Sequence, residues 1–443
     1  RMKNSEREDK EYEGKKEFRE CMKEAIKSSL SYLKKKAERE QIVPSQEYDF
    51  EIDINKRSWK TLPESRPPLV LFVEKNLEEI LKLAEVASCM DFMIKEIVKD
   101  VETVKNIIEK FLKKYVETIG EFDYDEITFN NLYRELEEYI YTEEREIIVI
   151  APLLNFELKG SERIDLGDFI IRKISEEELK VLVGKGVLNE CHFYPYGGHF
   201  KTIWCIELTS RRKRENLTFY IEDLTSCNKI IEDLEPRIEK VITALRLFKK
   251  GSIYYSAIIS YPKIWRDIWI ISSHERGKVY GQYYELTDED VENFKTFWSK
   301  FKTLQIKKFD VAIRRFNFSY ERKLPEDKLI DYIIAFEALF KGARSKLLAL
   351  RCAYLLGKDG EERKKIFEIL ESAYDIRNKI VHGGSIESIK EVLNRLNLNL
   401  AEFSMQVEEY LRESIKTFLH LQKSKSHDKI IKEIDEKIIT GFG

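Results

Sequence analysis

The stretch Tyr-Asp-Ile-Arg-Asn-Lys-Ile-Val-His-Gly-Gly, residues 374–384, determines how the C-terminal part of this chain is interpreted. It ends a segment, residues 361–382, in which apolar residues recur every three or four positions, as on the buried face of a helix. That face contains Ile366, Ile369, Ala373, Ile376 and Ile380. The segment therefore predicts a packed helix that carries several polar residues in its last turns.

Three of these polar residues do not belong to the apolar face. At about 100° per residue, Asn378 and His382 lie one above the other and point away from it, while Arg377 lies at its border. Gly383 and Gly384 are expected to loosen the helix end, so that His382 can turn toward the same opening as Arg377. The alternative is that His382 is a favourable cation at a helix C-terminus and Arg377 is a surface charge.

The sequence around this segment predicts further helices from Pro325 onward. The apolar periodicity and the breaks between segments place five of them, at residues 326–341, 343–357, 361–382, 386–397 and 399–424. Because the connections are only a few residues long, neighbouring helices are expected to be antiparallel and to form a compact bundle.

Upstream of the bundle the sequence changes character twice. Residues 1–45 are rich in Lys and Glu, and their sparse apolar positions, Phe18, Ala25, Leu30 and Leu33, suit a solvated helix; a helical stretch at 75–140 follows. From Ile147, short β-branched and aromatic runs predict strands. The predicted strands lie at 147–158, 168–174, 202–208, 217–222, 253–261 and 267–272. Between and after them we expect one helix that ends at Gly251 and another opened by the capping pair Thr287 and Asp290.

These elements predict an α+β protein in which helical and mainly β portions precede an all-α bundle. The expected regions are 1–145, mostly helical; 146–325, a mixed β/α sensor or regulatory region; 326–425, the bundle; and 426–443, a C-terminal tail.

The composition restricts the possible partners. The chain is 43% hydrophobic and 35% charged, which indicates a globular protein, and its 77 basic and 80 acidic residues leave a net charge of -3. Any contact with nucleic acid must therefore be local. Six cysteines without a C-x-x-C pair, no long apolar run and a charged N-terminal segment predict a cytoplasmic protein with no membrane span and no secretory signal.

Two other groups of residues could carry chemistry. Cys191, His192, His199 and Cys205 could bind zinc, but the spacing is wide and Cys205 lies in an apolar strand, so ordinary loop and core positions are favoured. The run Arg-Arg-Lys-Arg at 211–214 is interpreted as a solvated hairpin tip, with a phosphate contact as the alternative.

Three segments together resemble a known family. Ile-Ile-Ala-Phe-Glu-Ala-Leu-Phe at 333–340, Arg-Ser-Lys-Leu-Leu-Ala-Leu-Arg-Cys-Ala-Tyr-Leu-Leu-Gly at 344–357 and the stretch at 374–384 are similar to the HEPN superfamily. The similarity is greatest to the Apea-like HEPN domains of prokaryotic anti-phage proteins. It covers residues 326–425, and the upstream stretch Ala-Leu-Arg-Leu-Phe-Lys-Lys-Gly-Ser-Ile-Tyr at 244–254 also resembles sequence that precedes such domains. The first 225 residues resemble no family in this way.

The resemblance implies an activity. HEPN toxins are metal-independent endoribonucleases with an Arg-polar-x-x-x-His motif, which falls here on Arg377, Asn378 and His382. It implies RNA as substrate, no metal or cofactor, two motifs meeting across a homodimer, and a phage-derived or host trigger in antiviral defence. Lys379, Arg344 and Arg351 are expected to bind RNA, and Glu337, Tyr374 and Asp375 to support the site.

These groups suit RNA cleavage. Histidine can exchange protons with the 2′-hydroxyl or the leaving oxygen near neutral pH, and the arginine fork can stabilise charge on the phosphate. Each subunit supplies one such histidine, so a dimer would provide both an acid and a base. The alternative is a non-catalytic HEPN module for dimerisation or for binding RNA or a partner. The intact motif favours the nuclease, because a scaffold has no reason to keep two polar groups off the core face.

Overall fold

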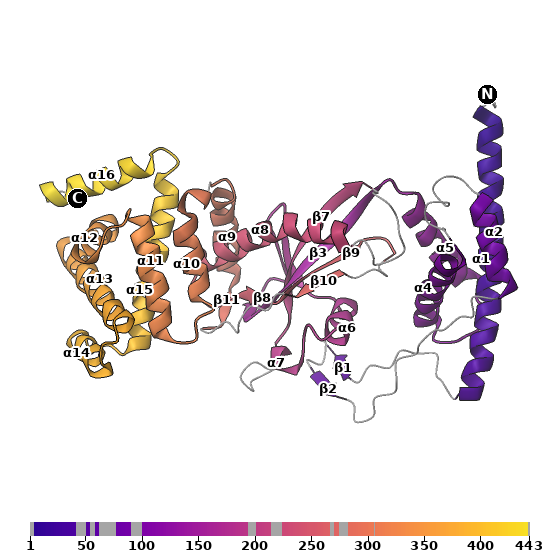
Figure 1. The fold of residues 1–443 in the computed structure, drawn as a ribbon, viewed down its shortest axis with the longest axis horizontal. Coiled ribbons are helices and arrows are strands. Elements are labelled where there is room, and N and C mark those ends of the chain that lie inside the picture. Colours follow the sequence, from indigo (N-terminus) through magenta and orange to yellow (C-terminus); the bar gives the residue numbers. More distant parts are fainter. Residues whose placement is uncertain are drawn as a thin grey trace. The chain divides into compact units, whose positions relative to one another are not determined.

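The computed structural model describes ten stretches of the chain, drawn as a coloured ribbon in Figure 1. They are residues 4–40, 50–53, 58–61, 77–89, 100–193, 201–213, 224–265, 270–273, 282–304 and 306–441. The fold is α+β, as predicted, with a helical C-terminal part. The chain divides into two units, described separately below. The first comprises Arg1–Ala151, Ile174–Leu234 and Ala257–Ser273, and the second comprises Pro152–Lys173, Glu235–Ser256 and His274–Gly443.

Four helices of the first unit pack around one apolar core. They are α1 (Asn4–Glu40), α2 (Glu78–Cys89), α4 (Val101–Ile119) and α5 (Glu126–Tyr141). Asp100 and Asp125 cap α4 and α5 by accepting hydrogen bonds from backbone N–H groups. The expectation that α1 is a solvated helix is wrong for one face. Its sparse apolar residues, which include Ala25 and Leu30, form a buried stripe against α2 and α4, because a few positions at helical spacing suffice to build a face.

The first unit also contains a sheet. Its strands β3 (Glu144–Leu154), β7 (Trp204–Lys213), β9 (Ala257–Pro262) and β10 (Ile270–Ser273) follow the order β10-β9-β3-β7, and β9 is antiparallel to both β3 and β10. A separate hairpin joins β1 (Phe50–Asp53) to β2 (Ser58–Thr61). Two short helices, α6 (Glu176–Gly184) and α7 (Glu190–Phe193), complete the unit, and a capping box of Ser175 and Glu178 opens α6.

The second unit begins with short strands. The hairpin of β5 (Arg163–Asp165) and β6 (Ile170–Lys173) is antiparallel, β4 (Phe156–Leu158) pairs in parallel with β11 (Tyr284–Leu286), and β8 (Tyr254–Tyr255) pairs with the end of β3. The predicted helix ending at Gly251 is α8 (Leu224–Phe248), which continues from the first unit into the second. The predicted capping box of Thr287 and Asp290 opens α9 (Asp288–Phe301), and the 3-10 helix η2 (Ile306–Phe309) follows.

The predicted strands at 147–158, 168–174, 202–208, 253–261 and 267–272 are confirmed within a few residues. The strand predicted at 217–222 lies outside the described residues. Among the described residues, no helix combines the length and the apolar character needed to cross a membrane.

The five helices predicted from 326 onward are confirmed. They are α11 (Pro325–Leu339), α12 (Ser345–Leu356), α13 (Gly360–Val381), α14 (Ile386–Leu396) and α15 (Leu400–Leu421). Another helix, α10 (Asp310–Ser319), packs on α11. The segment expected as a tail contains α16 (His427–Thr440), which packs on α12.

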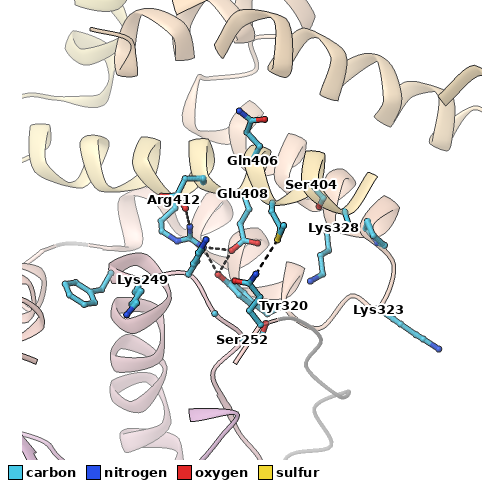
Figure 2. A pocket seen from close by; sticks show the side chains of 17 residues that line it. Lys249, Ser252, Tyr320, Lys323, Lys328, Ser404, Gln406, Glu408 and Arg412 are labelled. Carbon is cyan, nitrogen blue, oxygen red and sulfur yellow. Dashed lines mark hydrogen bonds and ion pairs between the residues drawn. The ribbon is translucent and has the colours of Figure 1, made fainter. Parts of the chain in front are cut away.

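A buried polar network fixes α15 in the second unit (Figure 2). The Arg412 side chain is only 2% exposed and forms an ion pair with Glu408, which also accepts a hydrogen bond from the Tyr320 hydroxyl at 2.7 Å. Arg412 Nε donates to the backbone carbonyl of Arg246 at 2.8 Å, and Arg246 donates to Asn317 Oδ1 at 3.1 Å. Residues from α8, α10 and α15 are therefore held by charge-assisted hydrogen bonds inside the core.

We expect Glu408→Gln to destabilise the second unit by about 3–5 kcal/mol, because it leaves the buried guanidinium of Arg412 without its inner partner. Urea-dependent hydrogen exchange of the α15 amides in the full chain measures this change. The matched control is Glu409→Gln, which removes an ion pair of Arg412 with a carboxylate that is 46% exposed and should cost less than about 1 kcal/mol. Equal losses in the two variants would contradict the assignment.

The pKa of His427 leads to a second prediction. Burial between Phe309 and Phe418 is the main reason that the pKa of His427 lies below its ordinary value of 6.5; Lys341 acts in the same direction, and Asp428 and the Leu339 carbonyl oppose it. The unfolded chain therefore binds this proton more readily than the folded chain. Stability should fall as the pH drops below about 6.5.

Thermal unfolding of the wild type and of His427→Gln between about pH 7.5 and 5.5 tests this effect. The variant should lose less of its melting temperature than the wild type, because it has no imidazole to protonate. His420→Gln removes an exposed histidine and should retain the pH dependence of the wild type. A pH dependence unchanged in His427→Gln would show that this site does not titrate on unfolding.

Candidate active site at the C-terminal end of α13

The helix α13 holds the predicted motif. Asp359 caps its N-terminus, and the predicted core positions Ile366, Ile369, Ala373 and Ile376 are buried, while Ile380 is half-buried. The helix packs against α11, α12, α14 and α15. Its apolar face is thus turned into the bundle and fixes the direction of the remaining side chains.

The two glycines fix the end of α13, contrary to the expectation that they loosen it. Gly383 adopts a left-handed conformation with φ of 73°, and its N–H donates to the carbonyl of Ile380 at 3.5 Å. The N–H of Gly384 donates to the carbonyl of Lys379 at 2.6 Å. These two bonds form a Schellman motif, which satisfies carbonyls that the helix itself leaves unpaired. His382, directly before them, is therefore held at a defined position.

His382 stands at the C-cap of α13 and is exposed. Its backbone N–H donates to the carbonyl of Asn378, one turn earlier. Its imidazole forms no hydrogen bond or ion pair with any residue in the described part of the chain. Both ring nitrogens are therefore accessible for proton transfer.

Arg377 and Asn378 are joined directly. Arg377 Nη1 donates to Asn378 Oδ1 at 3.0 Å, and the guanidinium lies 5.7 Å from the ring centre of Tyr374 on the preceding turn. Arg377 Nε is buried and has no hydrogen-bond partner among the described residues. The guanidinium thus lies on an aromatic face with one donor still unused.

Tyr374 connects α13 to α11. Its hydroxyl donates to Glu337 Oε1 at 3.1 Å. Burial is the main cause that raises the pKa of Tyr374, and Glu337 adds to it, while Arg377 and Arg344 oppose the shift. The Arg344 charge therefore lies within electrostatic range of the Tyr374 hydroxyl. The structure brings together five of the predicted site residues: Glu337, Arg344, Tyr374, Arg377 and Asn378.

Three other predicted residues are engaged elsewhere. Lys379 forms an ion pair with Asp375, four residues earlier on α13. Arg351 binds both carboxylate oxygens of Asp435 on α16 at 2.8 Å and donates to the carbonyl of Phe340. Arg351 thus links α12 to α16. Its partner lies in the segment expected as a tail, so no pattern near Arg351 in the sequence could have indicated this role.

Two exposed apolar side chains next to His382 were not singled out in the sequence. Val381 is 50% exposed and Ile386 is 67% exposed. They precede and follow the turn that contains His382 and the two glycines. Val381 lies off the predicted core face of α13, so helix geometry could have indicated its exposure, whereas Ile386 begins α14 and has no such relation to that face.

The other candidate groups are placed as follows. Cys205 is buried within β7, and the N–H of Asn189 donates to His192 Nδ1 at 3.0 Å; His199 lies outside the described residues. Among the described residues there is no group of three or more His, Cys, Asp or Glu side chains that could hold a metal ion. Residues 211–213 belong to β7, and Arg211 bonds to Glu146 at 3.1 Å. Arg214 and the rest of the predicted hairpin tip lie outside the described residues.

We expect Gly384→Ala to disrupt the end of α13. A Cβ at this position would lie 2.9 Å from Lys379 Cβ and 3.1 Å from Lys379 backbone atoms, so the Schellman bond must lengthen. Hydrogen exchange of the amides at 382–384 should accelerate by about fivefold or more, since a net hydrogen bond contributes about 1 kcal/mol. Gly360→Ala, at the start of the same helix and with no atom within 4 Å of the added Cβ, should leave these amides unchanged.

Comparison of the chain with protein-family models, with curated proteins and with solved structures gives no match. The function of this chain is therefore inferred from the side chains of α11, α12 and α13 and from the resemblance of their sequence to HEPN domains.

Proposed function

We propose that this chain is a HEPN endoribonuclease that cleaves RNA without a metal ion, through Arg377, Asn378 and His382. The observation that carries the proposal is the position of His382. Its imidazole is exposed and has no side-chain partner in the described part of the chain. His382 lies one turn beyond Asn378, which binds Arg377. His420, also exposed in the last turn of a helix, differs from His382 in having no such arginine and asparagine pair one turn before it.

Each group has a chemical role in this proposal. His382 takes the proton of the 2′-hydroxyl or gives one to the leaving 5′-oxygen. Arg377 stabilises the charge that develops on the phosphate through guanidinium N–H groups other than those of the buried Nε and of the Nη1 that binds Asn378. Asn378 holds the guanidinium in place. The contact of Arg377 with Tyr374 and the bond from Tyr374 to Glu337 support this orientation.

The proposed active form is a homodimer. One protomer supplies a single histidine at this site, whereas in-line cleavage uses both an acid and a base. The exposed Val381 and Ile386 beside His382 support an interface there, because apolar side chains of this size gain by burial against a second copy.

Arg344 is the proposed RNA contact closest to the motif. It is exposed at the N-cap of α12 and forms no ion pair with a described residue. Lys379 and Arg351 are bound to carboxylates, so they are expected to contribute less to RNA affinity. A role in cytoplasmic anti-phage defence, with a phage-derived or host trigger, follows from the resemblance to Apea-like HEPN domains.

The test is cleavage of labelled RNA by the purified full chain in the presence of EDTA. We expect fragments that end in a 2′,3′-cyclic phosphate and no cleavage of 2′-deoxy substrates. His382→Ala and Arg377→Ala should each lower the rate by about 10² or more, and Arg377→Lys should also fail, because a point charge does not reproduce the two-pronged phosphate contact.

The control is His420→Ala, which removes an exposed histidine on α15 and should leave the rate unchanged. Full activity in His382→Ala, or cleavage only with added metal, would refute the mechanism. RNA or partner binding without cleavage would instead favour the non-catalytic module, in which the bond between Arg377 and Asn378 has a structural role.

A further inference from the structure

A cavity of about 760 Å³ lies within the second unit, away from the motif on α13 (Figure 2). It is bounded by the end of α8 and the residues after it, the end of α10, and the first turns of α11 and α15. Its volume is within the range of small-molecule sites. The cavity therefore has room for a ligand of metabolite size.

The cations of this cavity fall into two groups. Arg412 is neutralised by Glu408 and Glu409, and Lys249 forms an ion pair with Asp290 at 2.7 Å. Three further lysines, Lys250, Lys323 and Lys328, also line the cavity. Neither Lys250 nor Lys323 forms an ion pair with a residue that the structure describes. The lining therefore carries positive charge beyond what its own carboxylates offset.

Lys328 is the innermost of these three lysines. It is half-buried, and Figure 2 shows its ammonium directed into the cavity, while Lys323 extends from the rim. Burial lowers the pKa of Lys328, and the nearby Glu408 opposes this shift. Glu408 also accepts hydrogen bonds from Tyr320, Tyr332 and Arg412, and an anion in the cavity would interact favourably with this ammonium.

The N-terminus of α11 opens at the same place. Pro325 lines the cavity as the first helical residue, and Leu324 at the N-cap offers no side-chain hydrogen bond to the first N–H groups. Pro325 has no N–H group, and the unbonded N–H groups of this turn belong to the next two residues, so the helix end supplies no donor to the cavity. Glu326 and Asp327 lie in the same turn, but neither lines the cavity.

Apolar groups line the rest of the cavity. Phe248 and Met405 contribute side chains, and Met405 is 47% exposed. Gly251 allows the chain to pass close to Tyr284. Its φ of 142° is unfavourable for other residues, and a Cβ added at this position would lie 2.8 Å from the Tyr284 ring. An organic group could contact these apolar side chains while a charged group reaches the lysines.

We propose that this cavity binds a small organic phosphate, with the phosphate at Lys250, Lys323 and Lys328 and the organic part against Phe248 and Met405. This site is separate from the motif on α13 and does not depend on the proposed nuclease activity.

Isothermal titration calorimetry of the full chain with phenyl phosphate tests the proposal. We expect saturable binding that weakens with added salt, and about tenfold weaker binding in Lys328→Gln and in Lys250→Gln. Phenol, which lacks the charged group, should bind at least tenfold more weakly than phenyl phosphate. The matched control is Lys300→Gln, an exposed lysine on α9 outside the cavity, which should bind as the wild type does.

The melting temperature of each variant establishes that the fold is retained, and Lys323→Gln, at the exposed rim, provides a substitution with little structural risk. Equal affinity in the wild type and in the three cavity variants would overturn the proposal. Equal binding of phenol and phenyl phosphate, or no binding of phenyl phosphate to the wild type, would also overturn it.

Discussion

The second unit depends on the compensation of one buried charge. The Arg412 guanidinium could not remain in the core without Glu408, the Tyr320 hydroxyl and the backbone carbonyl of Arg246. Glu408 also accepts a hydrogen bond from Tyr332 on α11 at 2.9 Å, so the network determines where α11 lies beside α15. Glu337 lies on α11, so the compensated charge also anchors the residue that accepts the hydrogen bond from Tyr374 of α13.

Local patterns in the sequence predict most of the helices and strands but not this network. Apolar periodicity, glycine stops and capping pairs are properties of neighbouring residues, and they placed the five bundle helices and most strands correctly. Glu408 and Arg412, four residues apart, have the spacing of an ordinary surface pair. Their burial depends on Arg246, which is 166 residues away in the chain and cannot be inferred from spacing.

The candidate site could likewise be predicted only where it depends on neighbouring residues of one helix. Asn378 and His382 could be placed off the core face by helix geometry, and both are at least partly exposed. The ion pair between Arg351 and Asp435 could not be predicted, because it depends on the packing of α16 on α12, which is a tertiary contact. The role of the glycines also required the structure, since the same two residues can loosen a helix end or close it with two hydrogen bonds.

The helix α11 bears a proposed ligand contact near each of its ends. Lys328 lies near its start and Glu337 near its end, nine positions or about 13.5 Å apart along one helix. Because Tyr332 anchors this rigid helix to Glu408 of α15, its two ends keep a fixed separation. The cavity at one end and the bond from Tyr374 to Glu337 at the other are therefore built on the same anchored element.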